Sequence, residues 1–183
     1  MRKVAVIVGS LSSKSINRSL ARALAALATP RLEFHEVDLS DLPMLNSEFQ
    51  NEPPPPVWRM KKEIEAADAV LIVSPENNRS VPAVLKNAID WGSRPWGKNS
   101  WADKPGAIIG ASTGQIGTAV AQQHLRTILS PLKVLLMGQP EAYIQLKPGM
   151  IDDAYRVSDE GLRKVLQSYV DAFILWIERN LSH

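Results

Sequence analysis

Short apolar runs alternate along this chain with segments whose apolar residues recur every three or four positions. The first run, Val4–Val8, is rich in β-branched residues, and similar runs follow at 32–37, 69–73, 107–111 and 134–137. A strand that is apolar at consecutive positions is typical of a parallel sheet covered on both faces, because neither face meets water. We therefore expect five strands in a buried parallel sheet.

Helical spacing of apolar residues fills the intervals between these runs. The predicted helices begin near Ile16, Trp58, Ser80, Gly117 and Ser158. We expect Ser80 and Ser158 to be N-cap residues, because a serine hydroxyl can accept from the free N–H groups of a first turn. Residues 53–56 are four prolines, which we expect to be extended and outside a helix. The βα alternation predicts a doubly wound α/β fold, whose ligands bind beyond the carboxyl ends of the strands.

The loop after the first predicted strand, residues 9–17, has the composition of a phosphate-binding loop. It contains four serines, Lys14 and Asn17, followed by a helix start whose N–H groups favour an anion. A polar turn capped by serine or asparagine is the simpler alternative. Two known nucleotide motifs do not fit: Ser13 stands where a P-loop has glycine, and Leu11 stands at the second glycine of the dinucleotide motif. Asp38, however, is placed as a ribose-binding acid would be.

The loop after the third predicted strand carries the most specific pattern. Residues 74–91 are Ser-Pro-Glu-Asn-Asn-Arg-Ser-Val-Pro-Ala-Val-Leu-Lys-Asn-Ala-Ile-Asp-Trp. This segment resembles the pattern P-E-Y-N-x-S-x-P-G-x-L-K-N-A-I-D-W of the NAD(P)H-dependent FMN reductase family, with Asn77 and Ala83 as departures. Gly9-Ser10 and the segment 110–126 resemble the same family, so the resemblance spans about residues 4–129.

The resemblance implies a single flavodoxin-like domain over residues 1–183, with a five-stranded parallel sheet in the order 2-1-3-4-5. It also implies noncovalent FMN, NADH or NADPH as reductant, and ping-pong hydride transfer to quinones, ferric chelates, chromate, nitro or azo compounds. A homodimer or homotetramer is expected. The chemistry would be carried by FMN rather than by a catalytic side chain. The residues expected to bind FMN are Ser10, Lys14, Ser15, Ile16, Asn17, Pro75, Glu76, Asn77, Asn78, Arg79, Ser112, Thr113 and Gly114.

Two departures from the family pattern bear on the site. Ser12 stands where the family usually has an arginine, so Lys14 or Arg18 is expected to supply the positive charge near the phosphate. Asn77 replaces a tyrosine and removes an aromatic wall. Farther along, residues 91–101 contain three of the five tryptophans. We expect these to pack in the core or an interface, and we consider Arg94 with a neighbouring tryptophan as a candidate contact for the acceptor or the nicotinamide phosphate.

Composition excludes several other functions. The chain has no cysteine, which removes disulfides, thiolate metal sites and cysteine nucleophiles and suits the cytoplasm. The net charge of +2 is too small to favour nucleic acid or an anionic membrane. His35, His124 and His183 lack metal-ligand spacing, so no metal is expected.

Two alternatives remain open. Residues 110–114 satisfy G-x-S-x-G, but the histidines fall in the wrong order for a hydrolase triad. The stronger alternative is an electron carrier or flavin-binding module without its own NAD(P)H site.

Overall fold

The computed structural model describes residues 1–181, and its centre is a parallel sheet in the order β2-β1-β3-β4-β5. The strands are β1 (Arg2–Val8), β2 (Leu32–Glu36), β3 (Ala69–Val73), β4 (Pro105–Ser112), β5 (Leu135–Leu136) and β6 (Tyr143–Gln145). The strand order confirms the predicted flavodoxin-like fold. The fifth strand is divided, because β5 pairs with the start of β4 and β6 pairs with its end at residues 110–112.

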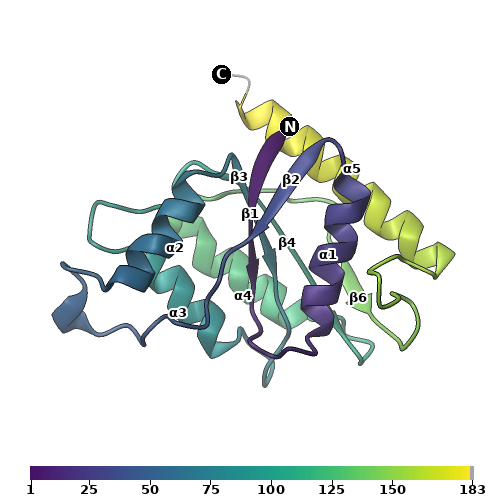
Figure 1. Ribbon diagram of the computed structural model, residues 1–183, viewed down its shortest axis with the longest axis horizontal. Helices are drawn as coiled ribbons and strands as arrows, with labels where there is room; N and C mark the ends of the chain where they lie inside the picture. The colour runs from purple at the N-terminus through teal and green to yellow at the C-terminus, as the bar shows by residue number, and fades with distance from the viewer. Residues whose placement is uncertain (182–183) are drawn as a thin grey trace.

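Helices cover both faces of the sheet, as Figure 1 shows. The α-helices are α1 (Ile16–Ala28), α2 (Pro55–Glu65), α3 (Ala83–Gly92), α4 (Ala119–Leu129) and α5 (Glu160–Leu181), and η1 (Ser47–Phe49) and η2 (Ser130–Leu132) are short 3₁₀ turns. Helices α1 and α5 pack on one face, and α2, α3 and α4 pack on the other.

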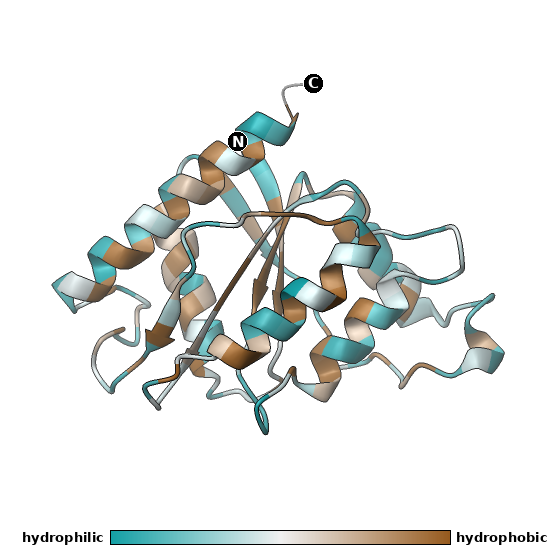
Figure 2. Cartoon of the chain, turned by 180° about the vertical axis from the view of Figure 1, so that it is seen from behind, coloured by the Kyte–Doolittle hydropathy of each residue, from teal (hydrophilic) through white to brown (hydrophobic). Residues whose placement is uncertain are grey.

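The central strands β1, β3 and β4 each contribute to two separate cores, because successive side chains point to opposite faces. In β1, Val4, Val6 and Val8 join the core beneath α1 and α5, whereas Ala5 and Ile7 join the core beneath the other three helices. Figure 2 shows this as continuously hydrophobic central strands between helices of mixed polarity. This double burial explains why the strands are apolar at consecutive positions.

Three predictions about helix starts were wrong. Pro55 and Pro56 form the first turn of α2, where proline is tolerated because its missing N–H has no partner in the helix. Ser80 does not cap α3, which begins after Pro82 without a side-chain cap. For α5, the Asp159 carboxylate accepts from the N–H of Leu162 at 2.7 Å and so takes the role predicted for Ser158.

Candidate functional site

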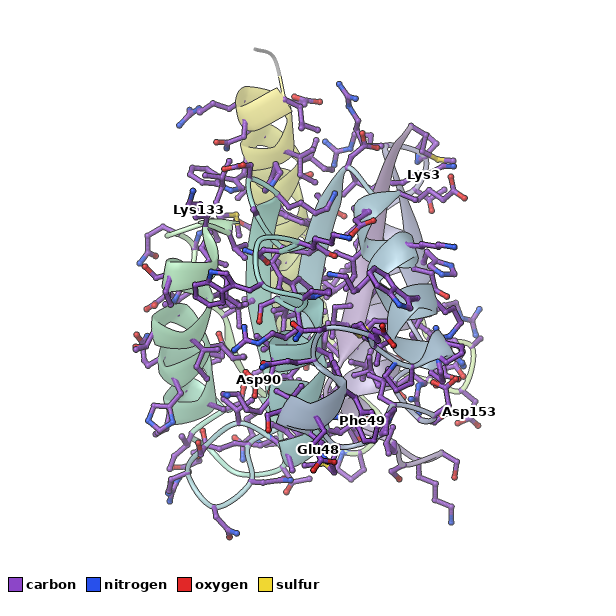
Figure 3. The ribbon with its side chains drawn as sticks, turned by 90° about the vertical axis from the view of Figure 1, so that its left-hand side faces the viewer. Lys3, Glu48, Phe49, Asp90, Lys133 and Asp153 are labelled. Atoms are coloured by element: carbon purple, nitrogen blue, oxygen red, sulfur yellow. The ribbon has the colours of Figure 1, made fainter. Side chains whose placement is uncertain are left out.

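The loops that follow β1, β3 and β4, here named the first, second and third loops, meet at the carboxyl edge of the sheet because these three strands are neighbours. The Gly9 N–H donates to Val73 O at 2.9 Å, and the Ser74 N–H donates to Ile109 O at 3.0 Å. The first residue of the first loop is therefore hydrogen-bonded to the end of β3, and the first residue of the second loop is hydrogen-bonded to β4. In Figure 3, Lys3 and Lys133 mark the opposite, amino edge, and Glu48 and Phe49 lie toward the carboxyl edge. The expected convergence of the three loops is thus present.

The side chain of Asn17 connects the first loop to the end of β4. Its buried side chain donates from Nδ2 to Ala111 O at 2.9 Å and accepts at Oδ1 from the Ala111 N–H, also at 2.9 Å. The α1 start and the end of β4 are therefore held together by one amide. This role leaves the side chain of Asn17 committed, so only its backbone N–H can serve a ligand.

Arg18 holds the backbone of the first loop in place through hydrogen bonds to its carbonyl groups. Its guanidinium donates to Ser10 O at 3.0 Å, to Ser12 O at 2.7 Å and to the Glu36 carboxylate at 2.6 Å. Because Arg18 is engaged in this way, Lys14 is the better source of charge for a phosphate. The Lys14 side chain is exposed and has no bonding partner in the part of the chain that the structure describes.

The first loop still offers hydrogen-bond donors to an anion. The hydroxyl of Ser15 caps α1 by accepting from the Arg18 N–H at 3.2 Å. Within residues 1–181, the N–H groups of Ser13, Ile16 and Asn17 make no hydrogen bond. Free N–H groups at a helix start, next to the exposed Lys14, suit a phosphate group.

The second loop contains a two-residue hairpin rather than a helix cap. Asn77 and Ser80 exchange backbone hydrogen bonds at 3.1 and 3.0 Å, and the residues between them, Asn78 and Arg79, have φ angles of 49° and 60°. Two left-handed residues in succession define the type I′ turn of tight hairpins. The turn presents Asn77, Asn78 and Arg79 as exposed residues at the carboxyl edge.

Glu76 joins the second loop to the third. Its Oε2 accepts from the N–H groups of Val120 and Ala121 at 3.0 and 3.1 Å, and Oε1 pairs with Arg79 at 3.2 Å. Thr118, at the start of α4, makes no side-chain cap, so Glu76 supplies the carboxylate that the helix N-terminus favours. Sequence reasoning assigned Glu76 to the ligand and missed this contact across 44 positions.

The third loop is held by its own bonds and by β6. Ser112 Oγ donates to Gly114 O at 2.8 Å, and Gln145 Nε2 donates to Thr113 O at 3.1 Å.

The histidine that follows the third loop does not reach Ser112. His124 contacts Ser80 Oγ at 3.0 Å. The described residues therefore give Ser112 no histidine partner, which argues against the hydrolase alternative, and His183 lies outside them.

The tryptophan-rich segment divides into buried and exposed parts. Trp91 and Trp101 are fully buried and donate from Nε1 to Pro43 O and Ile89 O at 2.7 and 2.9 Å, which confirms the packing role for these two. Trp96 is 85% exposed, and the Arg94 guanidinium lies 5.5 Å from its ring centroid. Within residues 1–181, the side chain of Arg94 contacts Ser93 Oγ at 3.1 Å and the Trp96 ring, and neither contact joins it to the three loops; Arg94 lies in the segment between α3 and β4.

A buried lysine holds this segment against α2. Lys61 Nζ donates to Gly92 O at 3.1 Å, to Lys98 O at 2.6 Å and to Ser100 Oγ at 2.7 Å, and Ser100 in turn donates to Glu65 at 2.5 Å. Lys61 is only 1% exposed. Burial lowers the pKa of Lys61 from its ordinary value, because the charged form loses hydration.

The lowered pKa of Lys61 predicts a pH-dependent stability. Between the folded pKa and the ordinary value of 10.5, the unfolded chain binds more protons than the folded chain, so the free energy of unfolding should rise with pH. Denaturant unfolding of the wild type and Lys61→Met across this alkaline range measures the effect. We expect the wild type to gain stability over the variant as pH rises; a constant or shrinking difference would contradict this assignment.

Other classes of site find little support. No three metal-ligating side chains among residues 1–181 gather as a metal site would require. In the same range, no helix combines the length and apolar character of a membrane span.

The donors at the edge match the chemistry of a flavin mononucleotide. The second and third loops also have free donors: within the described chain, the N–H groups of Glu76, Asn78, Thr113 and Gly114 make no hydrogen bond. These groups can donate to the carbonyl oxygens and ring nitrogens of a flavin. Together with the strand order, these loops define a flavodoxin-like mononucleotide-binding protein. The chain belongs to the NADPH-dependent FMN reductase family, whose model matches residues 2–148.

Relatives and a solved structure agree with this membership. A 2-hydroxy-1,4-benzoquinone reductase of Burkholderia sp. is 47% identical over 175 residues, covering 96% of each chain. An NAD(P)H-dependent FMN reductase of Pseudomonas aeruginosa is 40% identical, covering 97% of this chain and 96% of its own. The flavoenzyme NAD(P)H:(acceptor) oxidoreductase FerB of Paracoccus denitrificans is similar in structure, with a TM-score of 0.95, 47% identity and coverage of 98% and 99%.

Proposed function

We propose that this protein is an FMN-dependent NAD(P)H:acceptor oxidoreductase that reduces quinones. The observation that carries the proposal is the joining of three donor-rich loops by Asn17 and Glu76 at adjacent strand ends. The names of the relatives support the substrate class. Ferric chelates, chromate, nitro and azo compounds are further acceptors that the same activity would include.

The proposed FMN site divides into two parts. The phosphate would be held by the first loop through Ser10, Lys14, Ser15 and the N–H groups of Ile16 and Asn17. The ring would be lined by the second and third loops. The residues of that second part are Pro75, Glu76, Asn77, Asn78, Arg79, Ser112, Thr113 and Gly114.

The protein's contribution to the reaction is binding and orientation. FMN, when bound in these loops, would supply the chemistry of hydride acceptance and two-electron transfer. The Asn17 and Glu76 contacts hold the three loops at fixed positions, and these loops would hold the flavin ring by its edges and leave one face accessible. Reductant and acceptor would use that face in turn, which predicts ping-pong kinetics with parallel initial-velocity lines. Intersecting lines would contradict a shared site.

Pigment analysis and anaerobic reduction test the proposal. We expect the purified protein to release FMN on denaturation, and NADH or NADPH alone to bleach the bound flavin rapidly. A quinone added next should restore the flavin colour. Bound FMN that neither nicotinamide reduces would instead identify the electron carrier. A protein that cannot take up FMN would refute both functions.

The remaining proposals concern assembly and location. We propose that residues 1–183 form one flavodoxin-like domain and that this domain assembles as a homodimer or homotetramer in the cytoplasm. Trp96, an exposed aromatic residue stacked with Arg94, suits a contact between copies of the chain. Light scattering of the wild type and Trp96→Ser gives the oligomeric state.

A substrate role for Arg94 depends on that assembly, because within the described chain its side chain contacts Ser93 and Trp96 and makes no contact with the three loops. If a second copy brings Arg94 to the flavin edge, Arg94→Ala should raise the KM for the quinone about fivefold while the Kd for FMN stays unchanged. Lys98→Ala, which removes a cation from the same segment, is the matched control. Unchanged Michaelis constants for quinone and nicotinamide in Arg94→Ala would exclude the role.

A further inference from the structure

A hollow lies at the carboxyl edge of the sheet, on the β2 side of the first loop, which is the proposed phosphate loop. Its volume is about 320 Å³, and it opens between residues 8–13 and residues 36–40. Val8, Leu11 and Leu39 give it apolar walls, and Ser10, Ser13 and Asp38 give it polar groups. Leu11 is 54% exposed, which leaves its side chain available to a planar ligand.

Asp38 is a fixed anion at the rim of this hollow. Its Oδ1 accepts from the Ser40 N–H at 2.9 Å, and Arg59 donates to its backbone carbonyl at 2.7 Å, so both side chain and backbone are held. Hydrogen bonds from the backbone and side chain of Ser40 lower the pKa of Asp38; burial opposes them, and Arg59 and Arg18 add smaller lowering effects. The carboxylate therefore remains charged at neutral pH.

The hollow offers no free cation to balance this charge. Arg18 is its one basic lining residue in the described chain, and the Arg18 guanidinium is occupied by Glu36 and by two loop carbonyls. A carboxylate accepts hydrogen bonds from two neighbouring hydroxyls, and it repels a phosphate ester. The hollow is thus suited to a ligand with a free vicinal diol and an apolar ring.

We propose that this hollow binds the adenosine half of the reductant, with Asp38 accepting from the 2′- and 3′-hydroxyls of the ribose and thereby favouring NADH over NADPH. This inference rests on the proposed function, because it assigns a second subsite for the same nicotinamide dinucleotide. The adenine would lie against Leu11 and Leu39. The 2′-phosphate of NADPH would meet the Asp38 carboxylate, and no free cation is among the described residues that line the hollow.

Asp38→Asn tests the charge without removing the oxygen that accepts from Ser40. We expect the ratio of kcat/KM for NADH to kcat/KM for NADPH to fall about tenfold in this variant. Asp41→Asn is the matched control: Asp41 is also exposed, lies three positions away and pairs with Arg59, but does not line the hollow. The control should keep the wild-type ratio. An unchanged ratio in Asp38→Asn, or an equal change in the control, would overturn the proposal.

Calorimetry gives a second readout that does not depend on turnover. ADP-ribose should bind the oxidised, FMN-loaded wild type more tightly than 2′-phospho-ADP-ribose, and Asp38→Asn should remove most of that difference. The Kd for FMN should be the same in both proteins. Equal binding of the two nucleotides to the wild type would refute the subsite while leaving the reductase function intact; failure of the proposed function would instead appear as absent FMN or as flavin that neither nicotinamide bleaches.

Discussion

Replacing Asn17 by alanine is expected to lower the free energy of unfolding by about 2–4 kcal/mol and to weaken FMN binding by at least about tenfold. The substitution leaves the buried N–H and C=O of Ala111 without their partner, and each orphaned group costs desolvation energy. It also releases the first loop from β4, so the proposed phosphate and ring contacts no longer share one rigid frame. Urea unfolding and fluorescence titration with FMN measure the two effects.

Asn99→Ala provides the matched control. The Asn99 side chain also bridges two backbone groups, donating to Leu132 O at 2.8 Å and accepting from the Trp101 N–H at 3.0 Å, but it lies in the segment that leads into the start of β4. We expect this control to lose stability and to keep its affinity for FMN. If Asn17→Ala bound FMN as tightly as the wild type, the inference that this amide organises the site would be wrong.

The sheet and its order were predictable because they depend on short-range pattern. Consecutive apolar residues in Val4–Val8 and Ala69–Val73 result from burial on two faces, and this pattern is present in the sequence itself. Sheet geometry and loop composition likewise predict a site after the first, third and fourth strands, and the structure brings these three strand ends together. These predictions require only local composition and the general geometry of parallel sheets.

Two roles were missed because they depend on contacts between distant parts of the chain. Ser80 has the sequence context of an N-cap, but its backbone pairs with Asn77 and its hydroxyl faces His124. Glu76 caps a helix that begins more than forty positions later. No spacing rule reveals such contacts, because they depend on which loops the fold places side by side.

Arg94 marks the limit of reasoning from one chain. Its charge and the neighbouring tryptophans suggested a ligand contact, and the structure places the Arg94 guanidinium against Ser93 Oγ and over the exposed ring of Trp96. The substrate role stays a prediction that depends on a second copy of the chain, because the pattern of one sequence does not show how two copies meet.

Gly110→Ala should be the second severe substitution, lowering the free energy of unfolding by about 3 kcal/mol and reducing FMN affinity. A Cβ at this position would overlap the backbone carbonyl oxygen of Ser74 and the hydroxyl of Thr118. The first of these is backbone and cannot move without shifting the loop that begins at Pro75. The need for glycine here therefore comes from the close approach of β4 to the second loop, and not from a nucleophile elbow.

Gly138→Ala separates this steric effect from the general effect of adding a methyl group. A Cβ at Gly138 meets nothing within 4 Å, and its φ lies outside the left-handed region, so we expect wild-type stability and FMN affinity. Urea unfolding of both variants at equal FMN saturation compares them directly. A Gly110→Ala protein as stable as Gly138→Ala would mean that the second loop can move away from β4 with little loss of free energy. The second and third loops would then not act as one rigid support for the flavin.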